Sequence, residues 1–261
     1  MKKILIASLL ALSSVVAVAA DQPAVNPAFS KADEYIKAQN YTAAYQELDR
    51  LAKTGNAQAM YNLALLTQTG QGTAQSNSKA LKLYEDSAKK GYPVSNLALG
   101  QAYLTGGLGV KPDNKKAKEY LQKASDQGME DATVDLAVAL FSEGTDKSNK
   151  EGLAKLAPLI AKNNYKAMHA KALYDLTQGI KNKNEVSFKA GLQTIETLGK
   201  KGYIPALLAI ANMYTNGNII QQNLPEAKKI FEALAKENVP QAKESLATVN
   251  KLIATQPKAK S

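Results

Sequence analysis

The sequence contains no cysteine and a single histidine, His169, among 261 residues. Structural zinc sites and thiol catalysis depend on cysteine or on clustered histidines, so these absences exclude most chemistry of both kinds. No disulfide can stabilise the chain, and its stability must come from packed apolar faces. The sequence therefore predicts neither a metal site nor a cofactor.

Arginine is almost absent as well, because Arg50 is the only one, although the formal net charge is +10. Lysine makes point-charge contacts and lacks the bidentate fork that reads bases and phosphates. This composition argues against nucleic-acid binding. A basic exterior still favours anionic partners through long-range attraction.

Long apolar runs are missing outside residues 4–20, ILIASLLALSSVVAVAA, which follow Lys2 and Lys3. A basic start, an apolar stretch and small residues before a cleavage point are typical of a secretory signal peptide. The run is also short for spanning a bilayer core of ~30 Å. We therefore expect a cleaved signal peptide at 1–20, a linker at 21–27, export to the periplasm, and no integral membrane segment after cleavage.

A repeat of about 36 residues organises the rest of the chain. Glycine or asparagine, the residues that most readily close a helix in the left-handed conformation, recurs at Gly55, Gly91, Gly128, Asn164, Gly202 and Asn238. Fifteen residues before each of these stands a residue suited to capping a helix start: Asn40, Ser76, Asp113, Asn149, Ser187 and Asn223. These positions predict helices that begin and end in step.

Between the predicted caps, a four-residue spacing places small, large and small residues on one helix face, as in Ala44, Leu48 and Ala52. The same register predicts Leu153, Ala157 and Ala161 as the core stripe of a later helix. A second helix follows each stop. We therefore expect an all-α chain at 28–254, with about six helix pairs, a capping helix at 240–254 and a polar tail at 255–261. Such a stack forms a right-handed α/α solenoid, in which each pair contacts mainly its neighbours.

One segment carries a family resemblance. Residues 95–128 resemble the Sel1-like repeat, which is related to the tetratricopeptide repeat, at Leu99, Gly100, Tyr103, Gly106, Gly109, Val110, Asp113, Ala117, Tyr120, Ala124 and Gly128. Residues 59–91 and 206–238 match this pattern less completely, and 129–202 are degenerate. The glycines at 106–109 are therefore interpreted as a turn between helices. A phosphate loop would need a preceding strand and a lysine placed on the phosphates.

The resemblance implies a non-catalytic scaffold that assembles protein complexes. Exported bacterial members of the family often serve cell-envelope machinery such as secretion systems or polysaccharide export. The resemblance suggests a periplasmic adaptor that binds another envelope protein. The alternative is a protein that binds or modifies the cell wall, with its basic surface on peptidoglycan or another anionic polymer. A β-lactamase-like activity belongs to a cysteine-rich branch of the family and is not carried over to this chain.

Short motifs of β-lactam chemistry do occur, as S-x-x-K at 76–79 and 87–90 and as K-T-G at 53–55. The K-T-G precedes both serines and no strand is expected, so they are interpreted as coincidences. His169 has no partner for general-base catalysis and is expected on the surface or in a groove. Asp131 and Asp135 are interpreted as a solvated helix start.

A binding groove is predicted on the concave side, which the first helix of each pair lines in related tetratricopeptide-type repeats. Its candidate residues lie opposite the core stripe: Tyr61, Leu65, Gln68, Leu97, Gln101, Leu104, Val134, Val138, Phe141, Tyr174, Leu208 and Asn212. They would form an apolar groove edged by amides and suited to a partner helix or extended peptide. The alternative is packing against the adjacent pair, since solenoid helices bury a wide arc.

Overall fold

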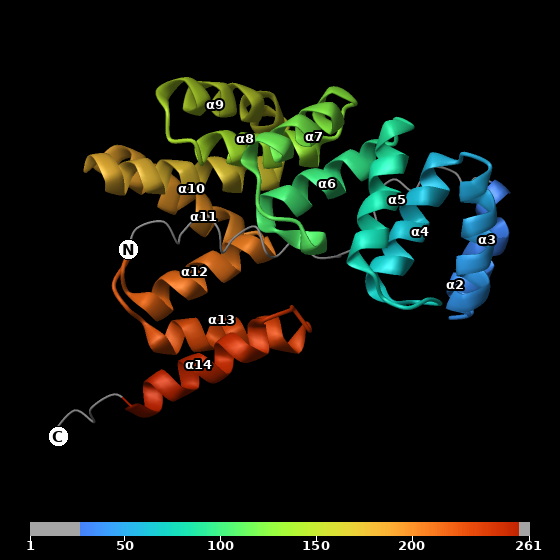
Figure 1. Cartoon of the computed structure of the whole chain (residues 1–261). Helices are drawn as coiled ribbons and strands as arrows, with labels where there is room; N and C mark the ends of the chain where they lie inside the picture. The colour runs from blue at the N-terminus through green and yellow to red at the C-terminus, as the bar shows by residue number, and fades with distance from the viewer. Residues whose placement is uncertain (1–26, 256–261) are drawn as a thin grey trace. The chain divides into compact units, whose positions relative to one another are not determined.

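The structure is a computed structural model that describes residues 27–255, and no strand occurs in that range. The predicted signal peptide at 1–20 and most of the predicted linker and tail lie outside the described residues. The helices, shown in Figure 1, are η2 (Pro27–Phe29), α2 (Ser30–Lys37), α3 (Tyr41–Lys53), α4 (Ala57–Thr69), α5 (Asn77–Lys89), α6 (Pro93–Thr105), η3 (Gly107–Gly109), α7 (Asn114–Asp126), α8 (Glu130–Phe141), α9 (Asp146–Ala161), α10 (Tyr165–Asn182), α11 (Glu185–Lys200), α12 (Ile204–Asn216), α13 (Leu224–Lys236) and α14 (Ala242–Thr255).

The chain divides into two compact units, residues 1–155 and 156–261. We call their described parts unit 1 (27–155) and unit 2 (156–255). In unit 1, consecutive helices from α2 to α8 contact each other, and in unit 2 the same holds from α10 to α14. Each unit is therefore built by helices that pack on their neighbours in the chain.

Four of the six predicted helix caps are confirmed by hydrogen bonds. In each case the cap side chain accepts a hydrogen bond from the backbone N–H of the residue three positions later. The distances are 3.2 Å for Asn40, 3.3 Å for Ser76, 3.0 Å for Asp113 and 3.2 Å for Asn223. Each bond satisfies one of the N–H groups that a helix start leaves unpaired. Part of the repeat in the sequence thus arises because each helix start has backbone N–H groups that require a side-chain acceptor.

The two remaining cap predictions are wrong. α11 is capped by Asn184, which accepts the Ser187 N–H at 3.1 Å, so Ser187 lies in the first turn. α9 begins at Asp146, where Thr145 Oγ1 accepts the Ser148 N–H at 3.1 Å, and Asn149 lies buried inside the helix. Several polar residues near the start of each of these helices can act as the N-cap, and the spacing of the repeat does not distinguish between them.

The core stripe of α9 also lies one or two residues earlier than predicted. The predicted stripe is wrong, because Leu153 is half-buried and both Ala157 and Ala161 are exposed. The buried positions are instead Gly152, Leu156 and Leu159.

The predicted helix stops are confirmed at Gly55, Gly91, Gly128, Gly202 and Asn238, all with positive φ between 55° and 87°. Asn164 is a wrong prediction, because its φ is −67° and it caps the start of α10. The left-handed residue is Asn163, with φ 59°. Two consecutive asparagines here perform the stop and the start, and asparagine suits both.

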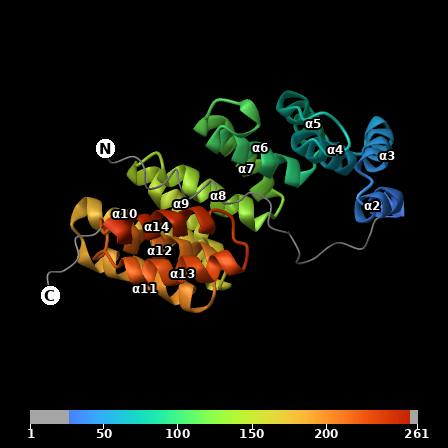
Figure 2. The same ribbon diagram turned by 90° about the horizontal axis from the view of Figure 1, so that it is seen from below.

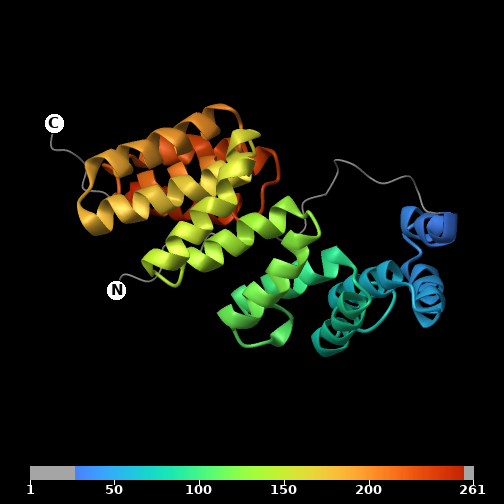
Figure 3. The ribbon, with the colours of Figure 1, turned by 90° about the horizontal axis from the view of Figure 1, so that it is seen from above.

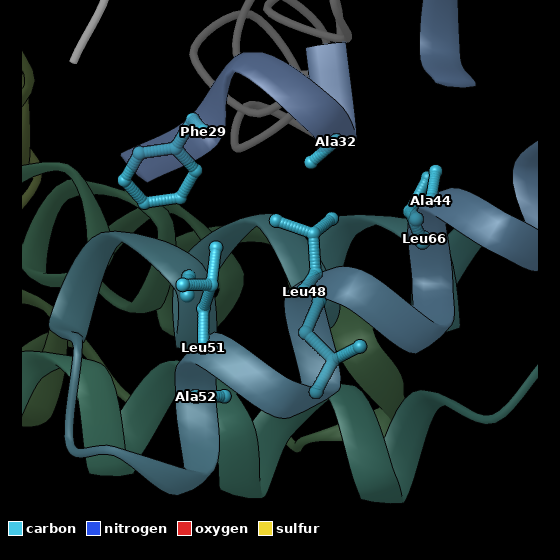
Figure 4. Packing of buried hydrophobic residues seen from close by; sticks show 9 residues of the cluster. Phe29, Ala32, Ala44, Leu48, Leu51, Ala52 and Leu66 are labelled. Atoms are coloured by element: carbon cyan, nitrogen blue, oxygen red, sulfur yellow. The ribbon is translucent and has the colours of Figure 1, made fainter. Parts of the chain in front are cut away.

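Buried alanines and leucines hold the first helices together. Leu48 and Ala44 of α3 are fully buried, and they belong to one cluster with Phe29, Ala32 and Leu51. Figure 4 shows Leu48 and Leu51 directed toward the segment that carries Phe29 and Ala32. Burying a leucine side chain stabilises the fold by about 2 kcal/mol.

The glycine-rich stretch between α6 and α7 is a turn between helices, as predicted. Gly106 closes α6 with φ 81°, and the backbone N–H of Asp113 donates to the Tyr103 carbonyl at 2.8 Å. Gly100 lets the helices approach closely, because a Cβ there would lie 2.6 Å from Leu121 Cγ. The glycines therefore serve packing and chain reversal.

In unit 2, α10 and α11 pack closely along their lengths (Figure 3). A Cβ on Gly179 would lie 2.6 Å from the Phe188 nitrogen, and one on Gly191 would lie 2.6 Å from the Ala172 carbonyl oxygen. Glycine inside a helix costs about 1 kcal/mol relative to alanine. The close contact between the two backbones at these glycines offsets that cost. α13 and α14 follow as another neighbouring pair (Figure 2).

We expect Gly191→Ala to destabilise the protein by about 2–3 kcal/mol, because the added methyl group meets backbone atoms of α10. At an exposed helix site the same change would stabilise by about 1 kcal/mol, so the sign is diagnostic. Denaturant unfolding measures the effect, with Gln193→Ala on the exposed face of α11 as the control. A Gly191→Ala protein as stable as the wild type would show that α10 and α11 do not approach this closely.

Candidate interaction surface

Six of the predicted groove residues lie on α4 and α6, the first helices of two consecutive repeats in unit 1. Each is half-buried, and we call this set the α4–α6 surface: Tyr61, Leu65, Gln68, Leu97, Gln101 and Leu104. The core-facing residues of the same helices, Leu63 and Leu99, are at most 2% exposed. The two helices therefore present a second, partly accessible face.

Tyrosines stiffen the edge of this surface on α4. The Tyr61 ring lies 5.4 Å from the Tyr84 ring and 5.5 Å from the Tyr92 ring, centroid to centroid. Tyr84 donates its hydroxyl to Gln68 Oε1 at 2.9 Å. Burial raises the pKa of Tyr61 and of Tyr84 above that of free tyrosine. Both phenols therefore remain neutral donors at physiological pH, and the amide of Gln68 is held in place.

A buried carboxylate supports the surface on α6. Gln101 Nε2 donates to Asp135 Oδ2 of α8 at 2.8 Å, and Asp135 is only 3% exposed. The prediction of Asp135 on a solvated helix start is therefore wrong. A sequence signal for this contact exists, because the two residues lie 34 positions apart, close to one repeat. Leu97 and Leu104 pack against the α7–α8 core cluster at the same time.

On α8 the packing alternative holds. Val134 is 2% exposed and Phe141 is 9% exposed, so neither lines an open groove, while Val138 is half-buried. A Cβ on Gly152 of α9 would lie 2.6 Å from Phe141 Cε1, which places the ring against that glycine. The apolar second face of α8 is therefore mostly interior.

The three candidates in unit 2 differ among themselves. Leu208 is buried at 6% exposure and serves packing, Tyr174 is half-buried, and Asn212 is exposed. The structure therefore does not make one groove of all twelve predicted residues. The six residues on α4 and α6 remain partly accessible, and so do Val138 on α8, Tyr174 on α10 and Asn212 on α12.

His169 is buried, and the prediction that it lies on the surface or in a groove is wrong. It is 6% exposed, its ring lies 5.6 Å from the Tyr203 ring, and its Nε2 has no hydrogen-bond partner among the described residues. Burial lowers the pKa of His169 to about 4. The imidazole is therefore neutral at pH 7 and enclosed by packing.

The serines of the S-x-x-K motifs serve the fold. Ser76 caps α5. Ser87 is fully buried, donates to the Ala57 carbonyl at 2.6 Å and accepts from Ser95 Oγ at 2.6 Å. Lys53 of the K-T-G motif pairs with Asp49 at 2.6 Å. These contacts give each motif a structural role.

The described residues, 27–255, hold neither a metal cluster nor a membrane-spanning helix. No group of three or more histidine, cysteine, aspartate or glutamate side chains there could hold a metal ion. Within the same range, no helix combines the length and apolarity needed to cross a membrane.

Positive charge is unevenly divided between the units. Unit 1 has 16 lysines and arginines against 15 acidic residues, a net charge of +1. Unit 2 has 13 lysines against 7 acidic residues, a net charge of +6. Any general attraction for anions therefore comes mainly from unit 2.

Comparison with known proteins identifies three Sel1 repeats, at residues 57–92, 93–129 and 204–239. They coincide with the helix pairs α4–α5, α6–α7 and α12–α13. Protein sel-1 homolog 2 of Homo sapiens is 35% identical over 88 residues, which are 34% of this chain and 13% of that protein. The match thus spans a small part of the human protein's length.

Two solved structures share the fold. One is c5321, a protective antigen present in uropathogenic Escherichia coli strains displaying an SLR fold, with a TM-score of 0.60 and 21% identity over 84% of this chain and 48% of that one. The other is a Sel1 repeat protein from Oxalobacter formigenes, with a TM-score of 0.59 and 20% identity over 84% and 88% of the two chains. The predicted fold class, an all-α, right-handed α/α solenoid of Sel1-like helix pairs, is confirmed.

The burial of His169 predicts a loss of stability in acid. Its folded pKa of about 4 lies below the unfolded value of 6.5, so protons bind preferentially to the unfolded chain between these pH values. Stability is therefore fully present above pH 6.5 and falls toward pH 4, by about 3 kcal/mol from this group. Denaturant unfolding from pH 7 to 4.5 should show this slope in the wild type and a shallower one in His169→Leu. Equal slopes in the two proteins would contradict the burial of a neutral imidazole.

Proposed function

Because this chain contains three Sel1 repeats, we propose that it is a non-catalytic scaffold that binds another protein through the α4–α6 surface. Sel1-repeat proteins are generally protein-interaction scaffolds. Two of the three matched repeats, 57–92 and 93–129, carry this surface. The proposal therefore assigns the general property of the family to its two consecutive repeats here.

The single observation that carries the proposal is a mixed apolar and amide surface whose polar groups are already held. Gln68 is bound by Tyr84, and Gln101 is bound to Asp135. Leu65, three residues before Gln68 on α4, is half-buried. A surface ordered before binding loses less conformational entropy on association. Apolar positions with amides at their edge suit a partner helix or an extended peptide.

The setting that we propose is the periplasm, with a cell-envelope protein as the partner. The N-terminal pattern at residues 1–20 supports export. In that compartment the scaffold would localise or stabilise a multiprotein machine, such as a secretion system or a polysaccharide exporter. The charge of unit 2 would assist encounters with acidic components of that machine.

A second candidate function is binding to an anionic cell-wall polymer such as peptidoglycan. The observation that favours it is the net charge of +6 on unit 2, against +1 on unit 1. Such binding would weaken steeply with salt, because exposed lysines act through screened charge. It would also be independent of the α4–α6 surface.

We expect a photo-reactive amino acid at Leu65 to cross-link one envelope protein, and the same residue at Lys82, exposed on α5, to leave it unlabelled. We also expect Leu65→Ser to weaken binding of the captured protein by about tenfold while helicity is retained. Leu252→Ser, at a 38% exposed leucine of α14, is the matched control. Equal labelling from Leu65 and Lys82, or equal binding by the two serine variants, would contradict the assignment. Salt-sensitive pelleting with purified peptidoglycan, unchanged by Leu65→Ser, would favour the second function.

A further inference from the structure

The hairpin formed by α10 and α11 departs from the regular repeat. These helices have 18 and 16 residues, whereas each helix of the three matched repeats has 13. At 1.5 Å per residue, α10 is longer by about 7 Å. The hairpin also lies outside the matched residues. Its tip, residues 180–186, is therefore not part of a matched repeat.

Two aliphatic side chains are exposed at this tip. Val186 is 79% exposed and Ile180 is 50% exposed, whereas other large apolar residues of the described chain reach at most 38%. The two most exposed apolar side chains thus lie six residues apart across one turn. Paired exposure of this kind marks interaction sites more often than single exposed apolar residues do.

Positive charge flanks the aliphatic pair. Lys181 and Lys183 are both exposed, and neither forms an ion pair within the described residues. The one acid of the tip, Glu185, is paired with Lys189 at 3.1 Å. The tip therefore presents two unpaired cations beside two aliphatic side chains.

The two helices of the hairpin are packed against each other up to the tip. The backbones of α10 and α11 meet at Gly179 and Gly191, and Phe188 packs against the core cluster of unit 2. Asn184 caps α11, and its backbone N–H donates to the Gly179 carbonyl at 2.9 Å. The exposed side chains are therefore held in position by the packing beneath them.

We propose that this tip docks on the surface of an anionic lipid bilayer, with Ile180 and Val186 in the interfacial layer and Lys181 and Lys183 at the headgroup phosphates. Two aliphatic side chains beside lysines match an interface that is apolar below and negative above. A bilayer yields around a projecting tip, so no preformed pocket is required. The net charge of +6 on unit 2 favours the same surface. The contact is peripheral and reversible, and it is independent of protein binding at the α4–α6 surface.

The absence of cysteine allows a clean test, because a single introduced cysteine can be labelled. The chain from Asp21 onward is used, since the apolar run before it would bind vesicles by itself. A polarity-sensitive fluorophore on Val186→Cys should shift to the blue with vesicles of phosphatidylglycerol and phosphatidylcholine. It should not shift with phosphatidylcholine alone, and added salt should reverse the change. The same label on Lys229→Cys, exposed on α13, is the control and should not respond.

Vesicle flotation then assigns the contact to named side chains. Ile180→Ser with Val186→Ser should weaken binding by about tenfold. Lys181→Gln with Lys183→Gln should weaken it by more than about tenfold, since each lysine near an anionic surface contributes about fivefold. Lys229→Gln with Lys236→Gln changes the net charge equally on exposed lysines of α13 and should have a much smaller effect.

Three results would overturn the proposal. One is that the unsubstituted protein does not float with anionic vesicles, as expected if the tip binds only an acidic protein. Another is that the aliphatic double variant floats as well as the unsubstituted protein. The third is that both lysine pairs weaken binding equally, which would show diffuse attraction to unit 2. Because these residues are exposed, unchanged circular dichroism is expected for every variant.

Discussion

Close approach of neighbouring helices at small residues is the constraint on which this structure depends. Without a disulfide, each helix pair is held by apolar contact, and fully buried alanines recur at equivalent positions: Ala44, Ala59, Ala80, Ala117, Ala132, Ala206, Ala227 and Ala242. A larger side chain at these positions would separate the helices, because protein interiors are packed without spare volume. Glycine continues the pattern at Gly100 and Gly191, where the neighbouring helix leaves no room for a Cβ. The repeat in the sequence therefore reflects the recurring close contacts between neighbouring helices at small residues.

The same constraint positions the surfaces that we assign to function. In unit 1, α4 and α6 turn one face inward at Leu63 and Leu99, which leaves the α4–α6 surface half exposed. Its amides are then fixed by groups from adjacent helices, Tyr84 and Asp135. In unit 2, Gly179 and Gly191 allow α10 and α11 to pack closely beneath the tip. Both surfaces consist of side chains that are not buried in the core, on helices whose other faces are packed in it.

The architecture could be predicted from the sequence because it rests on local signals, and the errors arose where a choice was not local. A cap or stop follows from one side chain and its own backbone, so Asp113 and Gly128 were correctly identified. The predictions at Asn164 and Asn149 are wrong because neighbouring polar residues serve equally well, and the core stripe of α9 lies one or two residues earlier than the spacing predicts. Burial at Val134, Phe141 and His169 depends on which element covers them, and periodicity within one helix does not contain that information. Periodicity also does not predict the exposure of Ile180 and Val186, because the exposure of an aliphatic residue depends on its surroundings.

The free energy of unfolding of an alanine variant tests the central constraint most directly. Ala80 of α5 is fully buried in one cluster with Ala64 of α4 and Leu99 of α6, and Tyr61 of the α4–α6 surface packs against this cluster. If close approach at small residues holds the repeats together, Ala80→Leu destabilises the protein by about 2–3 kcal/mol. Ala157→Leu, at an exposed position of α9, should change the stability by less than about 0.5 kcal/mol. Equal stability of the two variants would contradict the account.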